Sequence, residues 1–513
     1  MTFEPPEQLN IADYFLTDRL AEGAGERVAL RVGPRTWTYA EVDRLARRWA
    51  NGLVGSGVRR EERVVVALPD GVDFVGAFFG VLMAGAVVVL VNPDLAEPNL
   101  AATQAYVRPS RTVVAPEAVA RFEAAAARAG REPRLLVTGD DGGAHRALGA
   151  LDPDDAFVTV RTHRDEPAVW LFSGGTTGQP KAVVQPHRSF ANTTECYAKQ
   201  ALGYRADDRT LSVPKLYFGY ATGSNLLFPF AVGASAVLFA EPPTADVVFA
   251  QIAQHRPTVL VNVPKLIRDM VDHPEASARD LSCLRVATSA GEALPPALHR
   301  RWTDRFGTDL LDGLGTAEMW HIFCSNVPGD VRPGTLGRAV PGFEIRVRDD
   351  AGRDVAPGDV GRLWVRGGSR ALGYWLNLPQ TAEAFRGEWF AAGDMVAMDD
   401  AGYVTYVGRA DDALKVGGKW LLPAEVEECL AAHPQVAACA VAGVPDDAGL
   451  TKPVAFVVAE GASAELEEAL RAHALANLDA YKHPRRIVWV DELPRTHLGK
   501  VDRAALRRLA ERG

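Results

Sequence analysis

The sequence is poor in cysteine, which argues against two common kinds of stabilised scaffold. Its five cysteines are scattered along 513 residues, they form no close metal-binding pair, and their number is odd. A disulfide framework and a cysteine-based metal site are therefore not expected, and a reducing cytosol is the expected location. The amino terminus also lacks a basic stretch leading into an apolar one, so we expect no secretory signal.

An excess of positive charge is missing as well. The chain has 56 Lys and Arg against 65 Asp and Glu, which gives a formal net charge of −9. Nucleic-acid-binding proteins normally carry a basic face, so a general nucleic-acid binder is disfavoured. The 47% hydrophobic content and mixed charges are typical of a soluble globular protein, and the length predicts two or more domains.

The chain has one long uncharged apolar run, at residues 74–91, which reaches the length of about 18 residues that suggests a membrane span. Three glycines interrupt it, and its character changes midway from helical to β-branched. Residues 74–83 suit a helix, whereas residues 86–91 suit a strand, like residues 64–68 before them. We therefore expect a buried strand–helix–strand unit and no membrane partner.

Strand-like apolar runs alternate with helical patterns through most of the first 400 residues, which predicts an α/β fold with layered, mainly parallel sheets. After about Pro333, short strands punctuated by Gly and Asp predict an antiparallel, β-barrel-like subdomain. The last hundred residues return to a compact α+β pattern. We expect a large N-terminal domain at 1–408 and a small C-terminal domain at 409–513.

One stretch, Ser-Gly-Gly-Thr-Thr-Gly-Gln-Pro-Lys, follows an apolar strand-like run and is the most informative in the chain. Its glycines let the backbone approach an anion, while N–H groups, hydroxyls and a lysine can bind phosphate oxygens. It is not a Walker A loop, because that spacing is absent. A flexible linker is the alternative, but a polyphosphate, most simply ATP, is the expected ligand. The residues expected to cradle it are Ser173, Gly174, Gly175, Thr176, Thr177, Gly178 and Lys181.

Four later segments fit the same ATP-using site. Asp312–Glu318 places a carboxylate after a glycine turn, which suits Mg²⁺ on phosphates. Asp394 follows an expected strand and is suited to accepting both ribose hydroxyls. Residues 408–418 combine charges with glycines, and Lys500 follows a glycine near the end of the chain. Each segment alone has a structural alternative, a turn aspartate or a surface charge, but their joint occurrence in this order is a strong signal.

In this order the segments resemble the acyl-adenylate-forming superfamily of acyl-CoA synthetases, adenylation domains and luciferases, over essentially the whole chain. Residues 215–220, 289–294 and 312–326 are most similar to the benzoate:CoA ligase branch. The resemblance implies that a carboxylate attacks the α-phosphate of MgATP to give acyl-AMP and pyrophosphate, and that a thiol then displaces AMP. The implied cofactors are ATP, Mg²⁺ and coenzyme A.

The resemblance also implies a role for each matching residue. Lys500 would bridge the attacking carboxylate and the phosphate, which suits a point charge on a flexible stem. Glu318 would hold Mg²⁺, Asp394 and Arg409 would hold the ribose, and Asp312 would lie by the adenine amino group. The other expected members of this site are the catalytic Lys181 and the nucleotide-binding Gly313, Leu314, Gly315 and Thr316.

In such enzymes the small C-terminal domain rotates between the two half-reactions, and Asp411 matches the hinge position. Rotation would withdraw Lys500 and bring Lys415, Gly417 and Gly418 to the site. The two glycines would then leave room for a narrow thiol-bearing arm, although a plain β-turn also explains them.

The chain departs from the family pattern just before the expected magnesium ligand. The family usually has threonine there, but this chain has Ala317, with Thr316 one place earlier. A hydroxyl donor to the α-phosphate is thus missing or displaced, and one such neutral hydrogen bond is worth roughly 0.5–1.5 kcal/mol. Slower adenylation is expected, not its loss. The aromatic residue often found at the position of Leu314 is also absent, but leucine still offers adenine an apolar face.

Small residues beside an aromatic wall suit a flat ring better than a long acyl chain. The hypothesis is therefore an acid of the benzoate type, either unsubstituted or an amino- or hydroxybenzoate. A histidine in this pocket would lie near the carboxylate or a ring substituent, although a lone histidine is more often structural. The expected substrate-binding residues are Gly219, Tyr220, Ala290, Gly291, His321 and Ile322.

Three other functions stay open at this point. A free-standing adenylation enzyme would load the aryl acid onto the phosphopantetheine thiol of a carrier protein in trans, because no phosphopantetheine-type Gly-Gly-x-Ser segment is seen. A nucleotide-binding regulator without turnover is motivated only by Ala317, and a luciferase-like oxygenase has no positive support. The sequence does not decide between a monomer and a homodimer.

Overall fold

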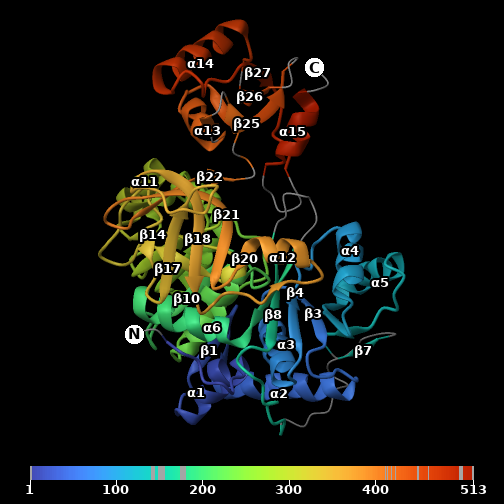
Figure 1. Cartoon of the computed structure of the whole chain (residues 1–513). Helices are drawn as coiled ribbons and strands as arrows, with labels where there is room; N and C mark the ends of the chain where they lie inside the picture. Colours follow the sequence, from blue (N-terminus) through green and yellow to red (C-terminus); the bar gives the residue numbers. More distant parts are fainter. Residues whose placement is uncertain are drawn as a thin grey trace. The chain divides into compact units, whose positions relative to one another are not determined.

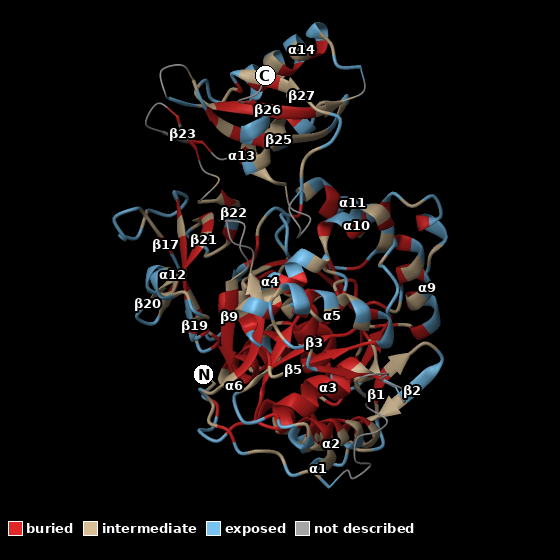
Figure 2. Ribbon diagram, turned by 90° about the vertical axis from the view of Figure 1, so that its right-hand side faces the viewer, coloured by how far each residue is buried: buried red, intermediate tan, exposed pale blue. Residues whose placement is uncertain are grey.

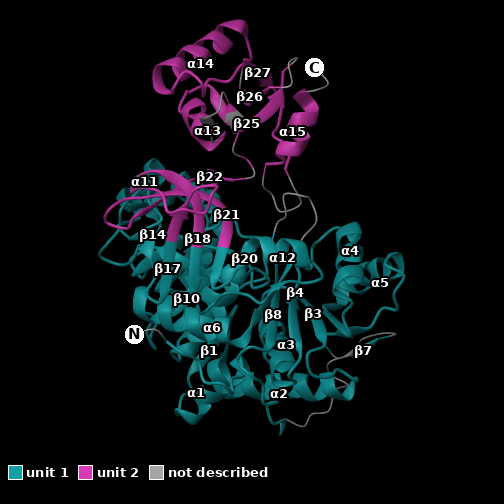
Figure 3. Ribbon diagram, viewed as in Figure 1, with its two compact units in different colours: residues 1–345, 365–390 teal, residues 346–364, 391–513 magenta. Residues whose placement is uncertain are grey.

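The structure is a computed structural model of the chain (Figure 1). It describes residues 3–139, 145–147, 156–173, 181–410, 412, 414–416, 419–421, 423–446, 450–459, 461–495 and 501–510. The chain divides into two compact units (Figure 3): unit 1 comprises Met1–Ile345 and Val365–Phe390, and unit 2 comprises Arg346–Trp364 and Ala391–Gly513. The expected domain boundary between residues 408 and 409 stays a prediction.

An eight-stranded sheet in unit 1 has the order β19-β9-β8-β4-β3-β5-β6-β7. The strands from β8 through β4, β3 and β5 to β6 and β7 are parallel, whereas β9 is antiparallel to β8 and β19 is antiparallel to β9. Its strands are β3 (Arg63–Ala67), β4 (Val87–Leu90), β5 (Arg111–Val114), β6 (Leu135–Val137), β7 (Arg146–Ala147), β8 (Pro167–Ser173), β9 (Lys181–Pro186) and β19 (Gly373–Tyr374).

The expected strand–helix–strand unit is confirmed as β3, α3 (Val72–Met83) and β4, and its apolar residues are buried. Figure 2 colours β3 and α3 as buried. Helix α2 (Tyr39–Gly55) packs on α3, and a Cβ at Gly80 would stand only 2.4 Å from Trp49 Cβ. Gly80 therefore allows the two helices to pack closely. No helix among the described residues has the length and apolar character needed to cross a membrane.

A nine-stranded sheet in unit 1 has the order β16-β15-β14-β13-β12-β10-β11-β1-β2. It is parallel from β1 to β14, and β2, β15 and β16 join antiparallel. Its strands are β1 (Val28–Val32), β2 (Arg35–Thr38), β10 (Arg209–Ser212), β11 (Ser235–Leu238), β12 (Val259–Asn262), β13 (Val286–Ser289), β14 (Leu310–Gly315), β15 (Ile322–Ser325) and β16 (Arg338–Ala339).

Helices connect the parallel strands and bury apolar faces against the sheets, which is the layered arrangement that the sequence predicts. Ligands of such sheets bind beyond the carboxyl ends of the strands, where β13 and β14 carry residues 289–290 and 312–315. The other helices of unit 1 include α4 (Glu97–Val107), α5 (Val119–Arg128), α6 (His187–Thr193), α7 (Gly219–Thr222), α8 (Phe228–Ala231), α9 (Ala245–His255), α10 (Pro264–Val271), α11 (Pro296–Phe306) and α12 (Leu378–Ala384).

The short strands expected after Pro333 are confirmed by a five-stranded sheet with the order β17-β18-β21-β20 and with β22 beside β21. Strands β20 and β22 both pair antiparallel with β21. The members are β17 (Phe343–Arg348), β18 (Val360–Gly367), β20 (Phe385–Arg386), β21 (Trp389–Met398) and β22 (Val404–Arg409).

The carboxyl-terminal part of unit 2 has the expected α+β character. Its three-stranded sheet β25-β26-β27 packs with helices around a core that includes Leu430, Val441 and Leu470. Its elements are the hairpin β23 (Leu414–Val416) and β24 (Lys419–Leu421), the sheet strands β25 (Val436–Pro445), β26 (Thr451–Ala459) and β27 (Arg486–Trp489), and the helices α13 (Pro423–Ala431), α14 (Ala464–Asn477) and α15 (Arg503–Ala510).

Candidate active site

A lysine and a carboxylate that are far apart in the sequence meet at one tyrosine in unit 1. Lys181 begins β9, and its Nζ lies 5.3 Å from the centroid of the Tyr374 ring. The Tyr374 hydroxyl donates a hydrogen bond of 2.8 Å to Glu318 Oε1. Tyr374 reaches this position because β19 pairs with β9, with Tyr374 opposite Val183. Two expected catalytic side chains thus share a neighbour that the sequence motifs did not include.

The turn that carries Glu318 is held from several sides. Gln185 of β9 donates from Nε2 to the carbonyl of Ala317 at 2.6 Å, and the N–H of Ala371 donates to the carbonyl of Glu318 at 2.8 Å. The Thr316 hydroxyl accepts from the N–H of Met319 at 3.3 Å and so caps this short turn. Thr316, one position before the threonine of the family pattern, therefore uses its hydroxyl to bind the backbone of its own turn.

A glycine is needed where β14 runs into this turn. A Cβ at Gly315 would lie 2.6 Å from the carbonyl oxygen of His321, closer than real Cβ contacts allow. After the turn, Trp320 adopts a φ of +63°, a left-handed conformation that a bulky side chain rarely takes. The chain thus doubles back tightly, which brings His321 beside the end of β14.

Asp312 lies on β14 with its side chain buried. Burial raises the pKa of its carboxyl group to about 8, although the neighbouring Ser289 side chain and the N–H of Gly313 act in the opposite direction. The backbone of Asp312 is fixed by Asn326, which donates to its carbonyl from Nδ2 at 3.1 Å. At neutral pH this carboxyl is mostly protonated, so it can donate as well as accept a hydrogen bond.

His321 is enclosed by aromatic side chains and is only 3% exposed. Its ring centroid lies 4.7 Å from that of Phe228 and 5.4 Å from that of Tyr220. Burial lowers the pKa of His321 to about 4, so the ring is neutral at physiological pH. Its Nε2 lies 3.0 Å from the carbonyl oxygen of Tyr220, and a carbonyl can only accept, so Nε2 carries the proton.

The aromatic wall around His321 is larger than the sequence predicts. Tyr220 is fixed by a hydrogen bond of 2.6 Å between its hydroxyl and Thr288 Oγ1. Tyr197 and Trp320 add rings at centroid distances of 5.6 and 5.4 Å from His321. No local motif identifies Tyr197 or Phe228, because the fold alone brings them to His321, whereas Trp320 directly precedes His321 in the sequence. Gly219 packs closely against Leu171, because a Cβ there would stand 2.9 Å from Leu171 Cδ1.

Three further expected pocket residues lie on or next to the strands of the same sheet. Ala290 is buried immediately after β13, and Ile322 is buried at the start of β15. Gly291 has a φ of +91°, which favours glycine, and a Cβ there would have no neighbour within 4 Å. The structure places these residues near the carboxyl ends of β13 and β14 without assigning them a ligand.

Unit 2 brings the expected ribose-binding pair together. Asp394 on β21 lies opposite Arg409 on β22, and Arg409 Nη1 donates to Asp394 Oδ1 at 3.0 Å. The aspartate is buried, whereas the arginine is partly exposed. Gly393 allows this approach, because a Cβ there would stand 2.5 Å from Arg409 Nη2.

Several expected site residues lie outside the described residues. These are Gly174, Gly175, Thr176, Thr177, Gly178, Asp411, Gly417, Gly418 and Lys500. The two ends of the glycine-rich loop are described: Ser173 closes β8 and stands opposite Lys181 in the register of β9. Lys415 is described only as part of strand β23.

The described side chains fit a magnesium ion that arrives with a nucleotide. Within the described ranges, no group of three or more His, Cys, Asp or Glu side chains forms a metal site of its own. Glu318 offers one carboxylate that is 8% exposed. Mg²⁺ is commonly held by one or two carboxylates together with substrate phosphates, so Glu318 suits this binding mode.

The chain belongs to the AMP-binding enzyme family, because the family's model matches residues 17–375 and the model of the AMP-binding enzyme C-terminal domain matches residues 425–500. It is 39% identical to a benzoate–CoA ligase of Thauera aromatica, over 98% of this chain and 96% of the relative.

Two solved structures are similar along nearly the whole chain. An anthranilate CoA ligase, AuaEII, in complex with anthranoyl-AMP is 36% identical with a TM-score of 0.90, and the match covers 99% of this chain and 98% of that one. A benzoate CoA ligase from Burkholderia xenovorans LB400 is 38% identical with a TM-score of 0.86, over 97% and 100% of the two chains. These likenesses bear out the resemblance of the motifs.

Proposed function

We propose that the protein activates an aromatic carboxylic acid of the benzoate type with ATP and transfers it to coenzyme A. The acid and ATP give acyl-AMP and pyrophosphate, and the CoA thiol then displaces AMP to give the aryl-CoA thioester. The carrying observation is that Lys181 and Glu318 meet at Tyr374 in the unit that also holds the aromatic enclosure of His321.

The similarity to benzoate and anthranilate CoA ligases supports an aryl acid as the substrate. The enclosure of His321 by Tyr220, Phe228 and Trp320 supports the same class, because flat aromatic walls suit a ring. The neutral imidazole suits a hydroxyl or amino substituent, with which it can form a hydrogen bond without carrying charge. We therefore include amino- and hydroxybenzoates.

Adenylation brings two anions together, so cations and N–H donors must spread the developing charge. In our proposal Lys181 and the loop from Ser173 bind the phosphates, and Lys500 bridges the attacking carboxylate and the α-phosphate. Asp394 and Arg409 hold the ribose. The remaining nucleotide contacts that we propose are Gly174, Gly175, Thr176, Thr177, Gly178, Asp312, Gly313, Leu314, Gly315 and Thr316.

Glu318 would hold Mg²⁺, which neutralises phosphate charge when it is bound with ATP. For thioester formation, we propose that the domain at 409–513 turns about Asp411 and presents Lys415, Gly417 and Gly418 to the pantetheine arm. The free cysteines among the described residues agree with a reaction in the cytosol.

A panel of aryl acids incubated with ATP, with and without CoA, tests the proposal by mass spectrometry. We expect acyl-AMP and pyrophosphate without CoA, and the aryl-CoA with it. Adenylation of medium-chain fatty acids with no reaction of any aryl acid would overturn the substrate class. If acyl-AMP forms but CoA gives no thioester, a carrier-protein thiol becomes the acceptor.

A further inference from the structure

Residues 369–374 form a segment that holds Glu318 at both its backbone and its side chain. The N–H of Ala371 donates to the Glu318 carbonyl at 2.8 Å, and the Tyr374 hydroxyl donates to Glu318 Oε1 at 2.8 Å. Between these contacts, the N–H of Leu372 donates to Val184 of β9 at 2.9 Å. The segment is thus fastened to the strand that begins with Lys181.

The start of the segment is anchored on α6. Ser369 is fully buried, and its Oγ lies 2.8 Å from Asn192 Oδ1 and 2.5 Å from Thr193 Oγ1. Gly368 lets the chain pass close to this helix, because a Cβ there would stand 2.7 Å from Asn192 Nδ2. A buried hydroxyl with several partners fixes the segment more firmly than exposed contacts would.

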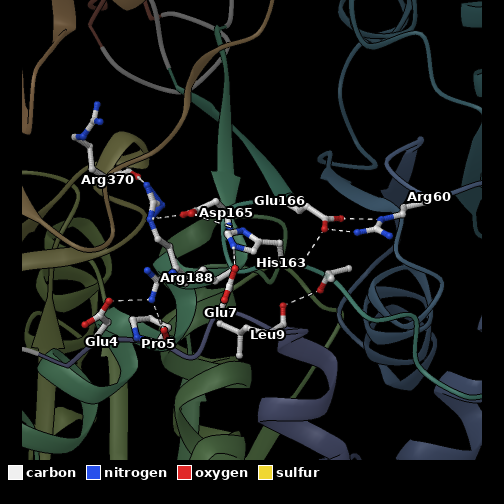
Figure 4. Close-up of polar contacts among 12 residues, drawn as sticks. Glu4, Pro5, Glu7, Leu9, Arg60, His163, Asp165, Glu166, Arg188 and Arg370 are labelled. Carbon is white, nitrogen blue, oxygen red and sulfur yellow. Dashed lines mark hydrogen bonds and ion pairs between the residues drawn. The ribbon is translucent and has the colours of Figure 1, made fainter.

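Arg188 of α6 provides a second anchor, which Figure 4 shows between Arg370 and Asp165. Its Nη2 donates to the carbonyl of Arg370 at 3.3 Å, while its Nε forms an ion pair of 3.0 Å with Asp165 Oδ1. The ion pair keeps the guanidinium in place for the carbonyl. The backbone N–H of Arg188 also donates to the carbonyl of Arg164 at 2.8 Å. This bond ties the start of α6 to the chain beside Asp165.

We propose that Tyr374 is a positioning residue for Glu318, and that Ser369 and Arg188 hold the segment that carries it. The tyrosine hydroxyl binds one carboxylate oxygen and fixes the rotation of the group. The second oxygen, Oε2, has no hydrogen bond within the described part of the chain and remains available to a metal-bound nucleotide. This inference rests on the proposed function, which gives Glu318 its magnesium.

The role follows from the hydroxyl and not from the ring. In Tyr374→Phe the ring still packs on Phe385, at a centroid distance of 5.5 Å, and still faces Lys181. The backbone pairing of β19 with β9 is also unchanged. The substitution therefore removes one hydrogen bond to Glu318 and leaves the surrounding fold in place.

The test measures cation binding separately from turnover. Mn²⁺ is titrated with the β,γ-imido analogue of ATP and followed by electron paramagnetic resonance, and aryl-acid-dependent pyrophosphate exchange is measured against Mg²⁺ concentration. Partners that orient a metal ligand typically contribute 10–100-fold in affinity or activity. We expect Tyr374→Phe to weaken Mn²⁺ binding by about that factor and to raise the Mg²⁺ requirement of exchange. Arg188→Gln and Ser369→Ala should act in the same direction by less.

Arg60→Gln is the matched control, because Arg60 pairs with Glu166 in the same polar cluster but contacts no residue of the segment in Figure 4. It should bind Mn²⁺ like the wild type. Wild-type Mn²⁺ affinity and Mg²⁺ dependence in Tyr374→Phe would overturn the inference. The wild type could bind Mn²⁺ with the nucleotide but exchange no pyrophosphate with any aryl acid. The proposed function would then fail, whereas the Mn²⁺ affinity of Tyr374→Phe would still test the positioning of Glu318.

Discussion

At the scale of single residues, Asp312 combines deep burial with a pKa raised to about 8. A carboxyl whose pKa is higher in the folded than in the unfolded state favours folding below its unfolded pKa, and this contribution is lost as the pH rises towards 8. Burying a group that prefers to stay protonated weakens the fold at neutral and alkaline pH. Such groups are candidates for ligand contact, since strongly perturbed pKa values gather at functional sites.

Asp312→Asn should therefore be more stable than the wild type at pH 8, with the difference shrinking towards pH 4. One pKa unit corresponds to about 1.4 kcal/mol, so a gain of at least about 1 kcal/mol is expected at pH 8. Urea denaturation at several pH values measures it. Parallel stability curves for the two proteins would contradict the raised pKa. The variant should also bind ATP more weakly if Asp312 contacts adenine.

At the scale of elements, some of the structure could be predicted from local sequence and some could not. The unit β3–α3–β4 was predictable because strand and helix patterns change within one apolar run. Tyr374 was not, because its hydrogen bond to Glu318 depends on the pairing of β19 with β9, strands almost 200 residues apart. The Asp394–Arg409 pair was intermediate in predictability, since its residues are 15 apart in the sequence and face each other across two antiparallel strands.

The packing of α2 on α3 predicts opposite effects for two glycine substitutions. Gly80→Ala places a Cβ 2.4 Å from Trp49 Cβ, so the helices must separate, and overpacking of this kind costs about 1–3 kcal/mol. Gly55→Ala, at the end of α2, meets nothing within 4 Å and should be neutral or slightly stabilising. Thermal unfolding of both variants measures this, and equal melting temperatures would contradict the tight contact.

The turn after β14 gives a prediction for the missing threonine. Ala317 is partly exposed, so Ala317→Thr can add a hydroxyl without disturbing the core. One hydrogen bond of about 0.5–1.5 kcal/mol corresponds to roughly a 2–10-fold faster pyrophosphate exchange. The glycine-rich loop that carries Thr176 and Thr177 can compensate for the hydroxyl missing at Ala317 by binding the phosphates more strongly. In that case Thr176→Ala or Thr177→Ala should slow pyrophosphate exchange more in the wild type than in the Ala317→Thr background. Additive effects throughout would refute this compensation.

At the scale of the whole molecule, each compact unit brings together its own group of expected site residues. Unit 1 holds Lys181, Glu318 and the aromatic enclosure, whereas unit 2 holds Asp394 and Arg409. The aromatic enclosure was only partly predictable, because Tyr197 and Phe228 come from helices without a recognisable motif. Motifs identify chemistry near glycines and charges, but core packing builds the aromatic surroundings of His321.

The two half-reactions should separate by mutation if the proposed rotation occurs. Lys500→Ala removes the cation expected beside the attacking carboxylate, and loss of one such stabilising group typically costs about 10²–10³-fold in rate. Pyrophosphate exchange should fall by this factor, whereas thioester formation from supplied acyl-AMP and CoA should be nearly unchanged. Gly418→Leu should show the reverse, because a side chain there would narrow the path of the thiol arm. Single-turnover assays of each half-reaction measure both variants. Equal losses in both half-reactions for Lys500→Ala would mean that one arrangement of the chain serves the whole reaction.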